Sequence, residues 1–175
     1  MDEHAVAARL RDGRHVDIRP ISASDADALV RFHEQLTAET TRLRFFVTHP
    51  HLTAEEVWRF THVDDRERAD LVALDGVDIV AVGRYERLTG TDDAEVAFVV
   101  ADAWQGLGIG THLLDRLTRR ARTQGITRLV ADTLGENRRM RAVFRHANRI
   151  TGFSTEAGVV HVVMNLDPEM VARPD

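Results

Sequence analysis

Residue types that could transfer a proton and bind an anion gather between residues 94 and 137 of this chain. Glu95 is the one carboxylate in the apolar run AEVAFVV, and the segment QGLGIGT, residues 105–111, places three glycines within five positions. An amphipathic helical pattern begins directly after it. A carboxylate can accept a proton from a nucleophile, and a glycine turn at a helix N-terminus exposes backbone N–H groups to an anion. The pattern therefore predicts an acid–base residue on a strand beside an anion-binding turn.

Three kinds of ligand-binding turn compete for the glycine pattern. A nucleoside-triphosphate loop needs a lysine followed by Ser or Thr after its last glycine, but Gly110 precedes THLL and the chain contains no lysine, which excludes it. A dinucleotide fingerprint, G-x-G-x-x-G, fails because Thr111 stands at the third glycine position counted from Gly106. The third kind of turn has the pattern Q-x-x-G-x-G, and residues Gln105 to Gly110 match it. A tight turn without any ligand remains the alternative.

Glu95 interrupts a strand pattern whose apolar residues alternate. Val96 and Phe98 mark one face of the strand, so Glu95 lies on the other face with Ala97. A carboxylate beside small apolar residues in a central strand is costly unless the protein uses it. The alternative is a glutamate in water at the end of a strand, since the polar turn at residues 91–93 is close.

Four segments carry a resemblance to a known family: VDIRP, AEVAFVV, QGLGIG and LVADTLGENRRMRAVFRHA, in this order along the chain. On these segments the sequence resembles the GNAT superfamily of acyl-CoA N-acyltransferases. The resemblance implies acetyl-CoA as the acetyl donor, with its pyrophosphate in the glycine turn and its pantetheine arm at the end of the AEVAFVV strand. The cofactor-binding residues expected on this basis are Val99, Val100, Gln105, Gly106, Leu107, Gly108, Ile109, Gly110, Thr111, Asn137 and Arg141. For Arg141, beside Asn137, an exposed basic helix face is the alternative to a contact with the 3′-phosphate.

The segments RLRFF, HPHLT and THVD resemble the bacterial protein-lysine acetyltransferase branch of this family. The resemblance implies transfer to the lysine amine of a protein, with Glu95 as general base, and a frequent acceptor in that branch is an acyl-CoA synthetase. Acetylation of a small amine and a CoA-binding regulatory domain without turnover stay open as alternatives.

Two positions depart from the family pattern. Many members carry a tyrosine that donates a proton seven residues after the asparagine, where this chain has Phe144. Phenylalanine cannot donate a proton, so the general acid stays unidentified. The family's Gly-Phe pair after this helix is replaced by Asn148 and Arg149.

Apolar spacing predicts one α+β domain over residues 1–175. The resemblance implies the GNAT acyl-CoA N-acyltransferase fold, a mixed central sheet of about six or seven strands flanked by about four helices. Helices are expected to start near Ser24, Thr53, Gly108 and Asn137. The segment TRLVADTL predicts a central strand that is apolar on both faces.

Composition narrows the class of protein further. A net charge of −5 gives no drive toward nucleic acid, and the absence of cysteine removes disulfides and thiolate metal sites. His49 and His51 lack further ligands at metal-binding spacing, and no apolar run is long enough to span a bilayer. We expect no metal, no membrane partner and a cytoplasmic location. The identity of the acceptor, the length of the acyl chain, the regulation and the oligomeric state are left open.

Overall fold

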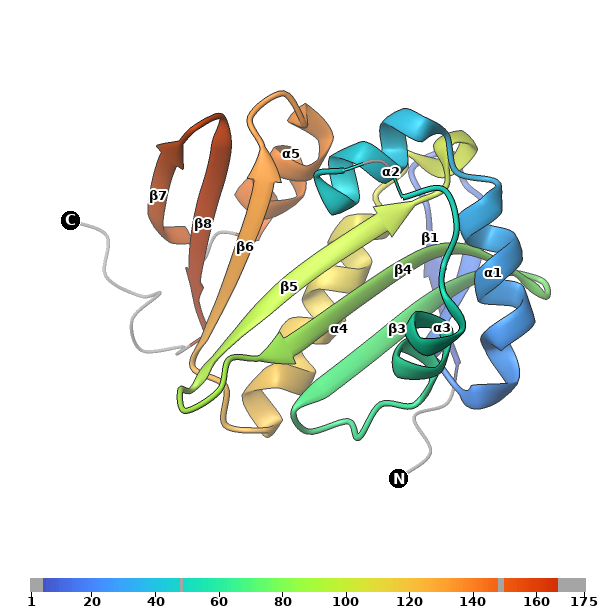
Figure 1. Ribbon diagram of the computed structural model, residues 1–175, viewed down its shortest axis with the longest axis horizontal. Helices are drawn as coiled ribbons and strands as arrows, with labels where there is room; N and C mark the ends of the chain where they lie inside the picture. The colour runs from blue at the N-terminus through green and yellow to red at the C-terminus, as the bar shows by residue number, and fades with distance from the viewer. Residues whose placement is uncertain (1–4, 48, 148–149, 167–175) are drawn as a thin grey trace.

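An eight-stranded mixed sheet forms the centre of the computed structural model, which describes residues 5–47, 49–147 and 150–166 (Figure 1). The strand order is β1-β2-β3-β4-β5-β6-β8-β7. Among the described strands, only β5 and β6 run parallel, and every other neighbouring pair is antiparallel. The strands are β1 (Val6–Arg9), β2 (His15–Pro20), β3 (Arg68–Asp75), β4 (Asp78–Arg87), β5 (Asp93–Val100), β6 (Arg128–Leu134), β7 (Ile150–Glu156) and β8 (Val159–Asn165).

Helices cover both faces of the sheet. The five α-helices are α1 (Ala26–Glu34), α2 (Ala38–Phe45), α3 (Ala54–Thr61), α4 (Ile109–Thr123) and α5 (Arg138–His146), with short 3-10 turns η1 (Ala23–Asp25) and η2 (Asp102–Trp104). On one face, α4 and α5 bury the larger apolar core, which includes Leu113, Leu117 and Phe144. On the other face, α1 and α3 enclose a smaller core around Phe32 and Val82. Helix α2 lies against β5 and β6 at their far end (Figure 1).

The observed fold confirms the α+β class and the mixed central sheet, and it adds one strand and one helix to the expected elements. Strand β1 is short, and helix α2 carries no apolar stripe, so neither has a clear periodic signal. Helical structure begins close to the expected Ser24, with the 3-10 turn η1 at Ala23 and α1 at Ala26. The capping box, however, is formed by Ser22 and Asp25 and not by Ser24. The expected helix start near Thr53 is confirmed, and Thr53 and Glu56 form a capping box there. Asn148 and Arg149 lie outside the described residues.

The segment TRLVADTL was expected to be apolar on both faces, and this is wrong for β6. Leu129, Ala131 and Thr133 are buried, but Asp132 on the opposite face is exposed. The reason is that β6 leaves its neighbour. Its parallel pairing with β5 covers only residues 93–95 with 128–130, whereas β5 pairs with β4 as far as Val100. Beyond Glu95 the two strands diverge, so part of this face is left uncovered (Figure 1).

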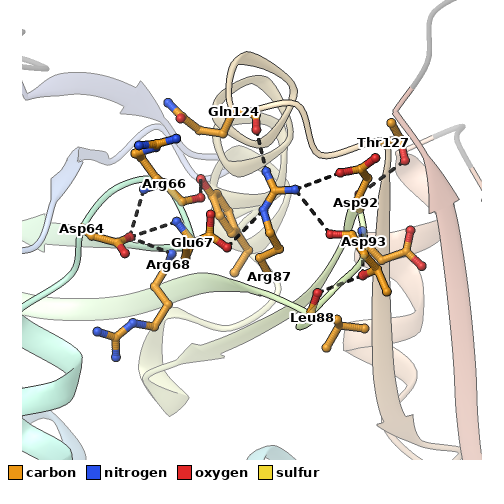
Figure 2. Close-up of polar contacts among 12 residues, drawn as sticks. Asp64, Arg66, Glu67, Arg68, Arg87, Leu88, Asp92, Asp93, Gln124 and Thr127 are labelled. Carbon is orange, nitrogen blue, oxygen red and sulfur yellow. Dashed lines mark hydrogen bonds and ion pairs between the residues drawn. The ribbon is translucent and has the colours of Figure 1, made fainter.

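Charged residues hold β5 and β6 together at the end where the two strands are still paired. Arg128 on β6 makes two hydrogen bonds of 2.8 Å to the Asp93 carboxylate on β5. Figure 2 shows Arg87 at the end of β4, which contacts Asp92 and Glu67 and donates 2.5 Å to the Gln124 carbonyl after α4. These contacts fix the start of β5, and hence Glu95, against its neighbours. No helix among the described residues is long and apolar enough to cross a membrane.

Candidate active site

The three glycines of the turn differ in what they require of the backbone. Gly106 and Gly108 adopt φ values of 79° and 96°, which side-chain-bearing residues rarely adopt. A Cβ on Gly106 would meet no atom within 4 Å, so that side of the turn is open. Gly110 lies inside α4, where a Cβ would come within 3.0 Å of Val143 on α5. The first two glycines therefore shape the turn, and Gly110 allows close packing of two helices beside it.

Unpaired backbone donors line this turn. Among the described residues, no amide from Gly106 to Gly110 donates a hydrogen bond to another residue. Helix α4 has 15 residues, Gly108 gives it no side-chain cap, and its first turn contains no acidic residue. Its N-terminus therefore keeps its positive dipole end and its free N–H groups. This arrangement suits a diphosphate, which carries negative charge and accepts several hydrogen bonds.

A cavity of about 590 Å³ opens over these amides, and we call it the glycine-turn cavity. Its size is in the range of cofactor sites. It reaches from the turn along the end of β5 to α5 and α2. The predicted residues that line it are Val99, Val100, Gln105, Gly106, Gly108, Ile109, Gly110, Thr111 and Asn137.

Two predicted cofactor residues lie elsewhere. Leu107 is not in the cavity lining, and its carbonyl accepts a 3.2 Å hydrogen bond from the Arg11 amide. Arg141 is also outside the lining, because its guanidinium turns back and donates 3.0 Å to the Gly135 carbonyl. The neighbouring Arg138 and Arg139 line the cavity instead.

Side chains at the cavity rim are already ordered by one another. Arg139 donates a 2.6 Å hydrogen bond to the Gln105 side-chain oxygen, and the side-chain nitrogen of Gln105 donates a 3.0 Å hydrogen bond to the Val100 carbonyl. The Asn137 side chain accepts a 3.1 Å hydrogen bond from the Met140 amide, which makes Asn137 the N-cap of α5. Its position in the site therefore follows from its role as a helix cap.

A second, smaller cavity of about 210 Å³ contains Glu95, and we call it the Glu95 cavity. Glu95 is exposed, with Ala97 and Phe98 beside it in the lining. Asp132 on β6 lines the same cavity, and its Oδ1 lies 2.5 Å from His161 Nδ1 on β8. Phe46, which is 40% exposed, belongs to its lining. Two carboxylates therefore face an opening that an amine could enter from solvent.

The two cavities adjoin. Five residues line both of them, namely Leu43, Arg44, Phe98, Asn137 and Met140. Sequence reasoning missed Leu43 on α2 and Met140 on α5 as site residues. The charge of Arg44 suits a cofactor phosphate or an acidic protein surface, but α2 has no periodic pattern that shows which way its side chains face. The RLRFF segment was the available signal, because it contains both Leu43 and Arg44.

A buried ion pair lies on the same face of the sheet as Glu95. Asp70 on β3 pairs with Arg84 on β4 at 2.9 Å, and their side chains are only 4% and 17% exposed. Burial raises the pKa of the Asp70 carboxyl to about 6. Burial lowers the pKa of Arg44 to about 10. Repulsion from Arg84 lowers this pKa further, and attraction to Glu95 raises it.

Comparison with known proteins agrees with this geometry. The sequence model of the Acetyltransferase (GNAT) family matches residues 29–148. The chain belongs to the GNAT acetyltransferase family. An acetyltransferase of Pseudomonas aeruginosa is 30% identical over 136 residues, which are 75% of this chain and 73% of that protein. The GNAT domain of Streptomyces lividans PAT superposes with a TM-score of 0.86 at 39% identity, covering 92% of this chain and 96% of that domain.

Relatives of this GNAT chain also include longer proteins. Acetyltransferase Pat of Mycolicibacterium smegmatis is 26% identical over 93% of this chain, which spans about half (49%) of its length. GNAT acetyltransferases use acetyl-CoA, and a Salmonella typhimurium protein of the same fold was solved with that cofactor, at a TM-score of 0.72 and 19% identity over 91% of this chain and 98% of that one. The open turn and its free amides fit the diphosphate of this cofactor.

Proposed function

We propose that this GNAT acetyltransferase transfers the acetyl group of acetyl-CoA to the lysine amine of a protein, with Glu95 as general base. The observation that carries the proposal is the adjoining of the two cavities. A donor bound at the glycine turn and an amine entering beside Glu95 would meet at the residues common to both linings. The likeness to the GNAT domain of Streptomyces lividans PAT supports it.

The chain's own groups divide the binding work. The amides from Gly106 to Gly110 would hold the diphosphate. Beyond Glu95, β5 has no parallel partner, and on that side the Val100 carbonyl already accepts from the Gln105 side chain. The remaining main-chain groups on that side are available to an extended arm, in the way a peptide adds to a sheet edge. Val99 and Val100 lie in this stretch and line the glycine-turn cavity.

Glu95 addresses the protonation of the acceptor. A lysine amine has a pKa of about 10.4, so near pH 7 almost all of it is protonated and cannot attack. The Glu95 carboxylate would take a proton from the amine directly or through water, as nitrogen bonds to the acetyl carbon. The oxyanion formed in that attack is stabilised by main-chain N–H groups at the diverging part of β5.

The experiment compares wild type with Glu95→Gln. A cell lysate is incubated with isotopically labelled acetyl-CoA and either protein, and labelled acetyl-lysine is mapped by mass spectrometry. We expect specific lysines to be labelled by wild type and hardly at all by the variant. Because the enzyme contains no lysine, its own side chains add no background. An acyl-CoA synthetase is the first purified acceptor to test.

Calorimetry with acetyl-CoA completes the test. The variant retains the whole glycine-turn cavity, so both proteins should bind acetyl-CoA with similar affinity. Equal labelling by both proteins would remove Glu95 from the proposed role. Binding by wild type without turnover on protein or small amines would instead favour a regulatory CoA-binding domain, a reading to which Phe144 gives some support.

A further inference from the structure

Among the described residues that line both cavities, Arg44 has the one cationic side chain. It lies in the last turn of α2 and lines both the glycine-turn cavity and the Glu95 cavity. The four other residues common to both linings cannot carry a positive charge, because three are apolar and Asn137 is neutral. Any positive charge supplied by a residue of both linings therefore comes from Arg44.

Among the described residues, the guanidinium of Arg44 makes no hydrogen bond or salt bridge, and the carboxylates of Glu95 and Asp70 act on it only through longer-range attraction. Its recorded contact is with the Phe45 ring, 4.9 Å from the guanidinium carbon to the ring centroid. Arg42, on the same helix, bonds Glu39 and Glu136 at 2.7–2.9 Å. An unpaired cation beside a cavity is costly unless a negative group arrives there, which points to a role toward the ligand.

The role that we infer for Arg44 follows from the lack of a proton donor at Phe144. When the thioester breaks, the departing sulfur gains negative charge, and a tyrosine would ordinarily neutralise it by donating a proton. Here Phe144 is buried and has no hydroxyl, although it lines the Glu95 cavity. Stabilisation by a fixed positive charge can replace a proton donor, because electrostatic stabilisation acts on the same developing charge.

We propose that Arg44 is a further catalytic residue, whose guanidinium stabilises the negative charge on the sulfur of coenzyme A as it leaves. This inference rests on the proposed function. In the step, the amine lone pair forms the nitrogen–carbon bond and the carbonyl electrons move to oxygen. The carbonyl then re-forms, and the carbon–sulfur bond breaks with its electron pair on sulfur. Nitrogen's surplus proton passes to Glu95, and the thiolate leaves beside Arg44 and later takes a proton from water.

A binding measurement tests this without knowledge of the acceptor. Calorimetry gives the affinities for CoA and for desulfo-CoA, which lacks the sulfur, between pH 7 and pH 9. A free thiol has a pKa of about 8.5, and a cation a few ångströms away lowers it by about one unit or more. Wild type should therefore gain affinity for CoA relative to desulfo-CoA by about fivefold over this range. Since the pKa of Arg44 is about 10, the guanidinium itself stays mostly charged between pH 7 and pH 9.

Other charges around the junction are held constant by taking the ratio of the two ligands. Arg84, Asp70 and Glu95 act on Arg44 from three neighbouring strands, and Asp132 lines the Glu95 cavity from β6. Their influence on the nucleotide part of the ligand is the same for CoA and desulfo-CoA. The ratio therefore reports on the surroundings of the sulfur alone.

Four variants sharpen the outcome. Arg44→Gln and Arg44→Met should lose the pH-dependent gain, Arg44→Lys should keep most of it, and Arg42→Gln, a control on the same helix outside both linings, should keep all of it. A ratio in wild type that does not change with pH overturns the inference, whatever the variants do. An unchanged gain in Arg44→Met also overturns it and leaves the proposed function standing. Failure of wild type to bind either ligand overturns both.

Discussion

The two cavities are built from different parts of the chain. The glycine-turn cavity owes its anion-binding capacity to backbone groups of one continuous segment, the free amides from Gly106 to Gly110. The Glu95 cavity is built from side chains on separate elements, with Glu95 on β5, Asp132 on β6 and Arg44 on α2. Backbone groups bind a feature that every acyl-CoA shares. Side chains on separate elements can change one at a time, so under the proposed function acceptor choice and proton chemistry belong to the Glu95 cavity.

The largest effect should come from Glu95→Gln, which separates the two cavities most sharply. Loss of a general base reduces kcat by about 100-fold to 10,000-fold. The affinity for acetyl-CoA should stay within about twofold, because the amides of the glycine turn are unchanged. Thiol release measured with the acceptor found in the lysate, together with calorimetry, tests both halves. A loss of acetyl-CoA binding equal to the loss of turnover would show that the two cavities do not divide the work.

The next effect concerns the buried ion pair of Asp70 and Arg84 on the Glu95 side of the sheet. With its pKa raised to about 6, folded Asp70 binds more protons than the unfolded chain between about pH 4 and pH 6. Wild type should therefore lose unfolding free energy relative to Asp70→Asn as pH rises through this range, on the order of 2–3 kcal/mol. Urea unfolding at several pH values measures it. Asp75→Asn, at the exposed end of the same strand, is the control and should follow wild type.

Gly106→Val should weaken acetyl-CoA binding at the glycine-turn cavity and leave the Glu95 cavity unchanged. At φ 79° a branched side chain is strained, and its atoms would project into the open side of the turn. The Kd for acetyl-CoA should rise by about tenfold or more, which corresponds to the strain expected at such a position. Gly90→Val is matched to it, with φ 75° and an equally open Cβ position in the turn before β5. If both variants weaken acetyl-CoA binding equally, general destabilisation is the cause and the turn has no special role.

The smallest effect should be that of Asp132→Asn on acceptor recognition. Asp132 is half-exposed, and its interaction with an incoming ammonium group should contribute about 0.2–1 kcal/mol. The KM for the acceptor should rise by up to about fivefold while kcat changes little. Glu34→Gln, an exposed carboxylate on α1, provides the control for loss of surface charge. A fall in kcat comparable to that of Glu95→Gln would instead make Asp132 part of the proton transfer.

Much of the fold could be predicted because its signals are local. The amphipathic pattern of α4 and the helix start near Thr53 each depend on neighbouring residues, and the structure confirms them. Helix α2 and strand β1 could not, because one has no apolar stripe and the other is too short to show a period. The direction of the Arg141 side chain could not be predicted, because it depends on the Gly135 carbonyl, which the sequence pattern does not position.

The sequence by itself determined where an anion can bind, since glycine spacing and a helix start fix the course of the backbone within one segment. It also set Glu95 on the strand face opposite Val96 and Phe98. Only the tertiary structure decided that this face is open, because the divergence of β5 from β6 depends on pairing between distant strands. It likewise decided that Arg44 reaches the junction of the two cavities, since the packing of α2 against β5 and β6 sets its direction.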